Sequence, residues 1–291
     1  MTIVQAGTLI ASGAELFIEH ELVFGHGTED AYWEAAWIVY HVVQQPFSQS
    51  IETLELLSSQ VTQIQQLFQR RIDERIPVAY LIHEAYFAGL AFYVDERVLI
   101  PRSPIAELIT QQFAPWLTVE PRRLLDIGTG SGCIAIACAY AFGQAMVDAV
   151  DISEDALVVA SRNVQLHQLV DRVHLYASDL FAALPPRQYD VIVSNPPYVD
   201  AIDMAVLPPE FTHEPSLGLA AGSDGLCIVE RILASASQFL TPQGLLIVEV
   251  GNSETALISQ YPHVPFTWLT FANGGQGVFL LTQAQLQQYF G

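Results

Sequence analysis

The chain has 291 residues, and its 31 acidic side chains against 11 basic ones, all arginine, give a formal net charge of −20. Hydrophobic residues make up 51% and charged residues 14%, which excludes a disordered chain, and the length predicts one large or two ordinary domains. Because no lysine is present, Schiff-base catalysis, a lysine general base and a P-loop phosphate site are excluded.

The net charge, the apolar runs and the cysteines indicate which binding partners and which compartment to expect. A surface this acidic repels nucleic-acid phosphates, so no nucleic-acid specificity is expected. The acidity favours a basic macromolecule as partner, although it is equally consistent with a role in solubility alone. The richest apolar run, 133–142, is too short to cross a bilayer, and the N-terminus lacks the basic segment of a secretory signal. Three cysteines without a C-x-x-C pattern fit reduced thiols in the cytoplasm, and no metal site is expected.

Residues 8–85 are predicted to be helical, because apolar side chains recur there at three- and four-residue spacing. One helix is expected at 30–43, with Thr28 as its cap. A further helix is expected to open at Ser48 or Ser50 and to continue along the same apolar stripe. The aromatic side chains of this region are expected to form a core.

A β-hairpin is predicted at 86–100, where β-forming residues are interrupted by Gly89 and by the polar triplet 95–97. It would connect a helical N-terminal domain, residues 1–85, to a main domain, residues 101–291. The helical domain is the expected site of substrate recognition.

From about residue 120, short apolar strands alternate with amphipathic helices, which is typical of an α/β sheet. The expected strands are 123–127, 146–151, 173–177, 191–195, 245–250, 266–271 and 278–282. Helix-length segments separate the first five, which are therefore expected to be parallel. The last two are joined by a short turn and are expected to form an antiparallel hairpin. Together they predict a seven-stranded sheet.

A glycine-rich turn follows the first of these strands and opens a helix. It reads Asp126-Ile-Gly128-Thr-Gly130-Ser-Gly132. Glycines at these places permit a tight turn and let a ligand approach the backbone closely. The spacing differs from the G-x-G-x-x-G fingerprint of dinucleotide sites, and a turn that binds no ligand can have the same pattern.

Acidic residues follow the second and third strands. Asp151 ends the second strand beside the glycine turn, where its carboxylate can accept hydrogen bonds from both ribose hydroxyls of a nucleoside. It can alternatively cap the following helix, as Ser153 also can. After the third strand, Asp179 is placed to meet an adenine amino group and Leu180 to pack on the base.

The most specific motif is Asn195-Pro196-Pro197-Tyr198, directly after the fourth strand. Its prolines fix the backbone at the sheet edge where α/β proteins bind ligands, and neither has an N–H. The Asn195 side-chain carbonyl and the Pro196 backbone carbonyl can together hold both hydrogens of an –NH2 group. This suits an amide or exocyclic amine, whose delocalised lone pair must be aligned with an electrophile.

The motifs D-x-G-x-G-x-G, V-D, S-D and N-P-P-Y, in this order across 120–200, resemble class I S-adenosylmethionine-dependent methyltransferases that modify planar nitrogens. The resemblance implies a Rossmann-like sheet with S-adenosyl-L-methionine as cofactor. The cofactor-binding residues it implies are Asp126, Gly128, Thr129, Gly130, Gly132, Asp151, Asp179, Leu180 and Asn195. The catalytic residues it implies are Asn195, Pro196 and Tyr198, which also bind substrate together with Pro197.

Residues outside these motifs narrow the resemblance to protein glutamine N5-methyltransferases. Pro101-Arg-Ser-Pro-Ile-Ala-Glu107 resembles the branch acting on large-subunit ribosomal protein uL3, whereas release-factor enzymes show P-R-P-D/E-T-E. The stretches 210–225, 248–252 and 271–275 agree, but Ala106 stands where that branch has glycine. The resemblance implies methylation of a uL3 glutamine, in the free protein or the assembling large subunit.

Three other functions stay open at this point. A release-factor glutamine methyltransferase shares the fold and the mechanism. A nucleic-acid amino methyltransferase shares N-P-P-Y, but the net charge of −20 makes binding to a phosphate backbone costly. A non-catalytic binder of the cofactor or of ribosome-assembly factors would not need the intact motif from Asn195 to Tyr198.

Overall fold

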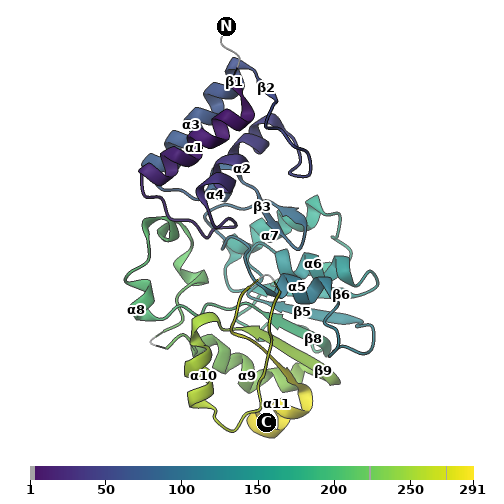
Figure 1. Ribbon diagram of the computed structural model, residues 1–291. Coiled ribbons are helices and arrows are strands. Elements are labelled where there is room, and N and C mark those ends of the chain that lie inside the picture. The colour runs from purple at the N-terminus through teal and green to yellow at the C-terminus, as the bar shows by residue number, and fades with distance from the viewer. Residues whose placement is uncertain (1–3, 223, 273) are drawn as a thin grey trace. The chain divides into compact units, whose positions relative to one another are not determined.

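The structure, a computed structural model, describes residues 4–222, 224–272 and 274–291 (Figure 1). It divides into two compact units. The helical unit comprises Met1–Ala85 together with Pro208–His213. The sheet unit comprises Tyr86–Leu207 and Glu214–Gly291. The inclusion of Pro208–His213 in the helical unit was not expected from the sequence.

The helical unit is built from α1 (Ala6–Glu19), α2 (Ala31–Val43), α3 (Ser58–Glu74) and α4 (Val78–Ile82). Two short strands, β1 (Val4–Gln5) and β2 (Glu55–Leu56), pair antiparallel. Aromatic and aliphatic side chains from all four helices are buried together, as the apolar spacing predicted. These residues include Phe17, Ile38, Ile64, Phe68 and Tyr80.

Two sequence predictions about the helical unit are wrong in detail. The side chain of Asp30, not Thr28, caps α2, where it accepts a hydrogen bond of 2.9 Å from the Trp33 amide. No helix opens at Ser48 or Ser50, because the backbone turns after Pro46, whose carbonyl accepts the Gln49 amide at 3.0 Å. Proline and serine favour a turn here, and this preference outweighs the weak apolar spacing that predicted a helix.

A buried ion network ties Pro208–His213 into the helical unit. Arg71 is fully buried, and its guanidinium donates to Glu34 at 2.9 Å and to the Val23 carbonyl at 2.9 Å. Glu210, also fully buried, lies 3.5 Å from Arg71 and accepts the Val23 amide at 3.1 Å. Arg75 donates to the same Glu210 oxygen at 3.3 Å. Glu210 therefore helps to fix this segment among the helices, together with His213, whose Nε2 lies 2.9 Å from the Glu74 carbonyl oxygen.

The sheet unit contains the seven-stranded sheet that the sequence predicted, in the order β10-β11-β9-β8-β5-β6-β7. Its strands are β5 (Arg123–Ile127), β6 (Met146–Asp151), β7 (Val173–Ala177), β8 (Tyr189–Ser194), β9 (Leu240–Glu249), β10 (Thr267–Trp268) and β11 (Val278–Thr282). The strands β5 to β9 pair in parallel, and β11 pairs antiparallel with both β9 and β10. Both strand directions agree with the prediction.

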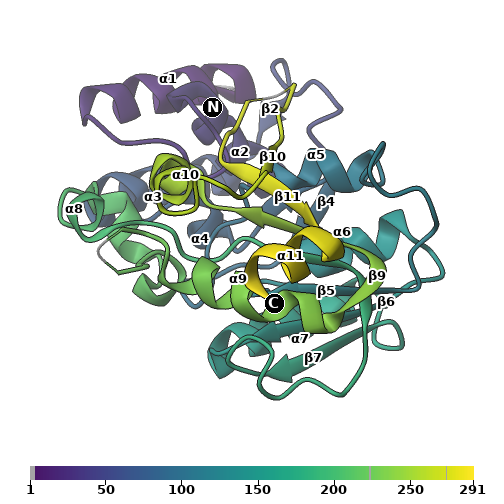
Figure 2. The same ribbon diagram turned by 90° about the horizontal axis from the view of Figure 1, so that it is seen from below.

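Helices cover both faces of the sheet (Figures 1 and 2). One core lies under α5 (Ile105–Thr110), α6 (Cys133–Ala141) and α7 (Glu154–Leu166). The other lies under α9 (Cys227–Phe239), α10 (Glu254–Gln260) and α11 (Gln283–Phe290). Because both faces are buried, the central strands are continuous apolar runs, as parallel sheets require. A four-residue helix, α8 (Ala201–Met204), lies in the segment after β8.

The predicted hairpin at 86–100 is present in a much shorter form. Strands β3 (Ala85–Phe87) and β4 (Leu90–Phe92) turn at Ala88 and Gly89, both of which have positive φ. The polar triplet Asp95-Glu96-Arg97 lies beyond the hairpin, which ends at Phe92, and in it Asp95 accepts hydrogen bonds from both the side chain and the amide of Arg97. Residues 96–103, called the strap below, continue as irregular chain.

Candidate functional site

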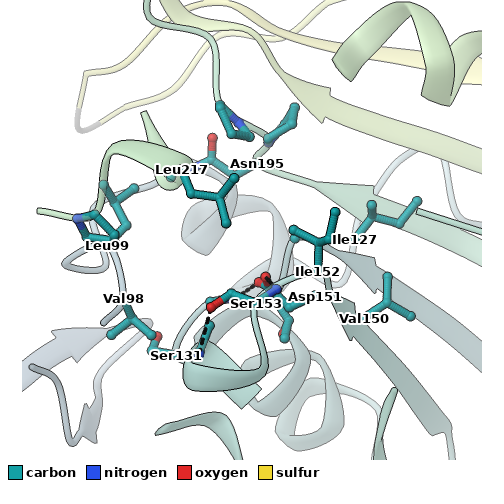
Figure 3. A pocket seen from close by; sticks show the side chains of 18 of the residues that line it. Val98, Leu99, Ile127, Ser131, Val150, Asp151, Ile152, Ser153, Asn195 and Leu217 are labelled. Carbon is teal, nitrogen blue, oxygen red and sulfur yellow. Dashed lines mark hydrogen bonds between the residues drawn. The ribbon is translucent and has the colours of Figure 1, made fainter. Parts of the chain in front are cut away.

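A cavity of about 450 Å³ opens where β5, β6 and β8 end at their carboxyl edge. Two loops and the strap complete its walls (Figure 3). Its lining from the sheet edge comes from 127–131, 150–153, 178–180 and 195–197. Ligands of α/β sheets bind at this edge, where strands on either side of β5 connect in opposite directions.

The glycine turn leaves open space on its cavity side. Gly128, Gly130 and Gly132 all have positive φ, at 72°, 53° and 82°, which favours glycine at each place. A Cβ atom at Gly128 or Gly130 would meet nothing within 4 Å, whereas one at Gly132 would meet Ala160 of α7 at 3.3 Å. The first two glycines therefore expose the backbone to a ligand, and the third allows close helix packing.

Asp126 lies behind the turn and is not part of the cavity wall. Its side chain is buried, and one oxygen accepts the Thr129 hydroxyl at 2.5 Å and the Ala135 amide at 3.2 Å. Burial raises the pKa of this carboxyl to about 7, against the lowering effect of the two hydrogen bonds. Asp126 therefore shapes the turn instead of contacting a ligand in the cavity.

Replacing Asp126 with asparagine should stabilise the protein at alkaline pH. A carboxyl with a higher pKa in the folded state contributes stability that is lost as the pH rises from about 4 towards about 7. Asparagine resembles the protonated acid and has no such loss. We expect Asp126→Asn to raise Tm by a few degrees at pH 8, equivalent to about 1–3 kcal/mol, with almost no difference at pH 4. If Tm changed with pH in the same way for both proteins, the raised pKa of Asp126 would be contradicted.

Asp151, at the end of β6, faces the cavity with both oxygens fixed. One oxygen accepts the Gly130 amide at 2.8 Å, and the other accepts the Ser153 amide at 2.9 Å (Figure 3). Burial raises the pKa of this carboxyl, whereas the backbone hydrogen bonds lower it. Each carboxylate oxygen retains a second lone pair for a ligand hydroxyl. The capping role falls to Ser153, which accepts the Ala156 amide at 3.2 Å.

The wall after β7 contains a charged residue that sequence reasoning missed. Asp179 and Leu180 line the cavity as predicted, and Asp179 accepts a hydrogen bond of 2.8 Å from Arg231 of α9. Both charged side chains are about half exposed, at 47% and 48%. Arg231 lies in the middle of an amphipathic helix, and no local sequence pattern indicates that it reaches the cavity wall beside Asp179.

Asn195 provides an unpaired acceptor in this cavity. It follows the last residue of β8, Ser194, whose hydroxyl donates to the Ile127 carbonyl at 2.8 Å and fixes the strand end. The Asn195 Oδ1 atom is buried and has no hydrogen-bond partner within the described part of the chain. Buried polar atoms without a partner are rare and indicate a missing donor. Pro196 and Pro197 line the cavity beside it.

Tyr198 does not line the cavity. Its hydroxyl donates to Glu249 at 3.0 Å, and its ring lies against Gly251, where a Cβ would overlap it. Burial and the Glu249 carboxylate raise the pKa of the phenol. Tyr198, which the family resemblance implies to be catalytic and to bind substrate, is therefore held against Glu249 and Gly251 instead of lining the cavity. Gly132, like Asp126, also lies off the wall.

An ion pair joins the strap to Glu214, which directly precedes the segment 215–220 that supplies another part of the wall. Arg102 donates to the two oxygens of Glu214 at 2.6 and 2.8 Å. Glu214 is buried and also accepts the Ile100 amide at 3.0 Å. These residues come from two irregular segments, so periodicity could not pair them.

No group of three or more His, Cys, Asp and Glu side chains among the described residues is arranged to hold a metal ion. No helix within the described ranges is long and apolar enough to cross a membrane.

Comparisons with known proteins agree with the fold. The family described as "Methyltransferase small domain" matches residues 106–210. A protein named "Ribosomal protein uL3 glutamine methyltransferase" from Francisella tularensis is 46% identical, covering 93% of this chain and 87% of its own length. A protein of the same name from Neisseria meningitidis is 45% identical, covering 93% of this chain and 90% of its own.

Among solved structures, the hMettl16 catalytic domain in complex with MAT2A 3'UTR hairpin 6 is similar in fold. The TM-score is 0.53 and the identity 18%, with 84% of this chain and 90% of that chain covered. The sheet and its carboxyl-edge cavity define a class I methyltransferase fold, and S-adenosylmethionine is the cofactor of this class. Within that class, the chain belongs to the family of ribosomal protein uL3 glutamine methyltransferases.

Proposed function

We propose that this protein transfers a methyl group from S-adenosylmethionine to the side-chain amide nitrogen of a glutamine in ribosomal protein uL3. The observation that carries the proposal is the buried, unpartnered Oδ1 of Asn195 beside the glycine turn in one cavity. The relatives at 46% and 45% identity bear the corresponding name. Ribosomal proteins are modified where ribosomes assemble, so we propose the cytoplasm as its location.

The proposed amide-binding turn, residues 195–197, orients the substrate nitrogen. The glutamine amide donates one hydrogen to Asn195 Oδ1 and the other to the Pro196 carbonyl. S-adenosylmethionine would supply the methyl group from its sulfonium. The bond from the methyl carbon to sulfur would break as the bond to nitrogen forms, a neutral thioether would leave, and the nitrogen would then lose one proton to solvent. Orientation of this kind can remove roughly 7–11 kcal/mol of a bimolecular barrier. The same two oxygens stabilise positive charge as it develops on the nitrogen, because they are fixed before the reaction.

The proposed cofactor site uses the residues around the glycine turn. The cradle at Gly128 and Gly130 fits a ligand held close to the backbone, because a Cβ at either place would project into open space. We assign the ribose hydroxyls to Asp151, and the adenine to Asp179 and Leu180. Thr129 lines the same wall. Asp126 and Gly132 contribute by shaping the turn.

Asp151→Ala should weaken cofactor binding about 10- to 100-fold, since hydrogen bonds to a charged group are worth about 1.5–3 kcal/mol. Calorimetric titration with S-adenosylmethionine measures this Kd directly. The control is Asp171→Ala, which removes an exposed carboxylate of the sheet unit away from the cavity. Equal Kd values for the two variants would contradict the ribose assignment.

The substrate is tested by transfer of a labelled methyl group to purified uL3 and to a purified peptide-chain release factor, followed by mass-spectrometric mapping. We expect a methylated glutamine in uL3 and none in the release factor. Label on the release factor alone would be consistent with the proposed mechanism but would contradict the assignment of uL3 as the substrate. No label on either protein would overturn the proposed function and favour a nucleic-acid substrate or a non-catalytic role.

The helical unit is the proposed site of substrate recognition. Within 4–85 the basic side chains Arg70, Arg71 and Arg75 are each paired with a glutamate. Exposed acids such as Glu15 and Glu19 on α1 therefore leave the unit strongly negative. An acidic surface of this kind accelerates association with a basic protein.

Neutralising Glu15 and Glu19 together, as Glu15→Gln/Glu19→Gln, should raise KM for uL3 about threefold to tenfold without changing the cofactor Kd. The matched control is Glu120→Gln/Asp171→Asn, which removes the same charge from exposed positions of the sheet unit. Initial rates at low and high salt check the cause, because screening should reduce the difference. Equal KM changes in both pairs would assign the effect to net charge alone.

A further inference from the structure

Glu249 ends β9 beside the amide-binding turn. The parallel ladder pairs Val248 with Ser194, so Glu249 and Asn195 leave the sheet at the same edge. The Glu249 side chain is buried. Its carboxylate accepts two hydrogen bonds, one to each oxygen. Tyr198 donates to Oε1 at 3.0 Å and Ser103 donates to Oε2 at 2.5 Å.

The two donors belong to opposite functional parts of the site. Ser103 ends the strap, lines the cavity and accepts the amide of Ile105, the first residue of α5, at 3.2 Å. Tyr198 follows Pro196 and Pro197 directly. One carboxylate therefore fixes a wall of the cofactor cavity and the turn that carries Asn195.

Tyr198 can transmit this position to the turn because it is restrained at three points. Its hydroxyl is held by Glu249, its ring packs on Gly251, and its carbonyl accepts the Ser253 hydroxyl at 3.1 Å. The two preceding prolines have fixed φ angles, so little backbone freedom separates Tyr198 from Asn195. A displacement of the phenol would therefore move Asn195.

We propose that Glu249 is a positioning residue that couples the cofactor wall to the amide-binding turn through Ser103 and Tyr198. In-line transfer requires both partners at a fixed separation, and a misplacement of about 1 Å can cost roughly 100-fold in rate. An ionised carboxylate suits this role because it accepts both hydroxyls at once, whereas a glutamine offers one oxygen acceptor. The inference rests on the proposed glutamine methylation for its kinetic readout.

A double-mutant cycle on Ser103→Ala and Tyr198→Phe tests the coupling, since each change removes one hydroxyl from Glu249. We expect either change to lower kcat about 10- to 100-fold, and the double variant to resemble the slower single variant. Cofactor Kd, measured by calorimetry, should stay within about threefold in all of them. The proposal would be overturned if the fold-loss of kcat in the double variant equalled the product of the two single losses. It would also be overturned if either single variant kept the wild-type kcat.

Two further variants separate positioning from general stability. Glu249→Gln should retain more kcat than Glu249→Ala, because one of the two hydrogen bonds can re-form. Tyr261→Phe is the matched control, since Tyr261 donates to Glu230 at 3.2 Å in a similar pair away from the cavity wall. Its kcat should equal that of the wild type, and a loss as large as that of Tyr198→Phe would overturn the proposal.

A measurement without substrate keeps this inference separate from the proposed function. The Val199 amide donates to the Leu219 carbonyl at 2.9 Å, directly after Tyr198. If Glu249 couples the two parts, Ser103→Ala should speed hydrogen exchange at Val199. Unchanged exchange there would overturn the coupling. A protein that shows the exchange effect but methylates neither test protein would refute the proposed function alone.

Discussion

Asn195→Ala should lower kcat for glutamine methylation by about 100- to 1,000-fold, the usual loss when one preset hydrogen-bonding group is removed from an active site. The buried Oδ1 of Asn195 is an acceptor in the cavity for which the described residues offer no donor, and alanine leaves the amide with one partner instead of two. The nitrogen would then sample orientations in which its lone pair misses the methyl group. Single-turnover rates at saturating cofactor measure this loss directly.

The same variant should bind S-adenosylmethionine almost as tightly as the wild type, because the glycine turn and Asp151 are unchanged. Asn252→Ala is the matched control, since Asn252 is exposed and follows β9 on the same sheet. It should keep wild-type kcat. Asn195→Asp gives a second check, because aspartate preserves the shape and an acceptor but adds a charge. Wild-type turnover in Asn195→Ala would refute the amide-binding turn.

Local patterns predicted the parts of the site that depend on one stretch of chain. The glycine turn, Asp151 and the Asn195 turn each follow a strand whose apolar run is unambiguous, and all three face the cavity. Strand boundaries were less exact: β8 begins at Tyr189, β9 at Leu240, and β10 is limited to Thr267–Trp268. The starts of β8 and β9 were missed because Asp190 and the turn-forming stretch 241–244 interrupt their apolar runs, whereas the edge strand β7 was predicted at its observed bounds.

The remainder of the site depends on pairs of residues far apart in the chain. Arg102 with Glu214 and Arg231 with Asp179 each join separate segments, and no local pattern indicates that either pair forms. Periodicity predicts which face of an element is buried, but not which side chain of another segment meets it. Asp126 shows the converse case, because its motif was recognised while its burial behind the turn was not.

The buried network around Arg71 was equally invisible in the sequence, and its loss should have the largest effect on stability. Arg71→Met leaves Glu34 and Glu210 buried with less compensating charge. We expect the helical unit to lose about 3–5 kcal/mol of unfolding free energy, as when one partner of a buried ion pair is removed. Hydrogen exchange of the α2 and α3 amides measures this locally, since two units need not unfold together.

The adjacent residue provides a matched control. Arg70 pairs with Glu74 four residues later, and both side chains are about half exposed, at 49% and 43%. Arg70→Met should therefore cost less than about 1 kcal/mol. Arg71→Met/Glu34→Leu should recover much of the loss, because Glu210 keeps Arg75 and no unpaired carboxylate remains at position 34. Equal destabilisation by Arg70→Met and Arg71→Met would show that the network does not hold Pro208–His213 in the unit.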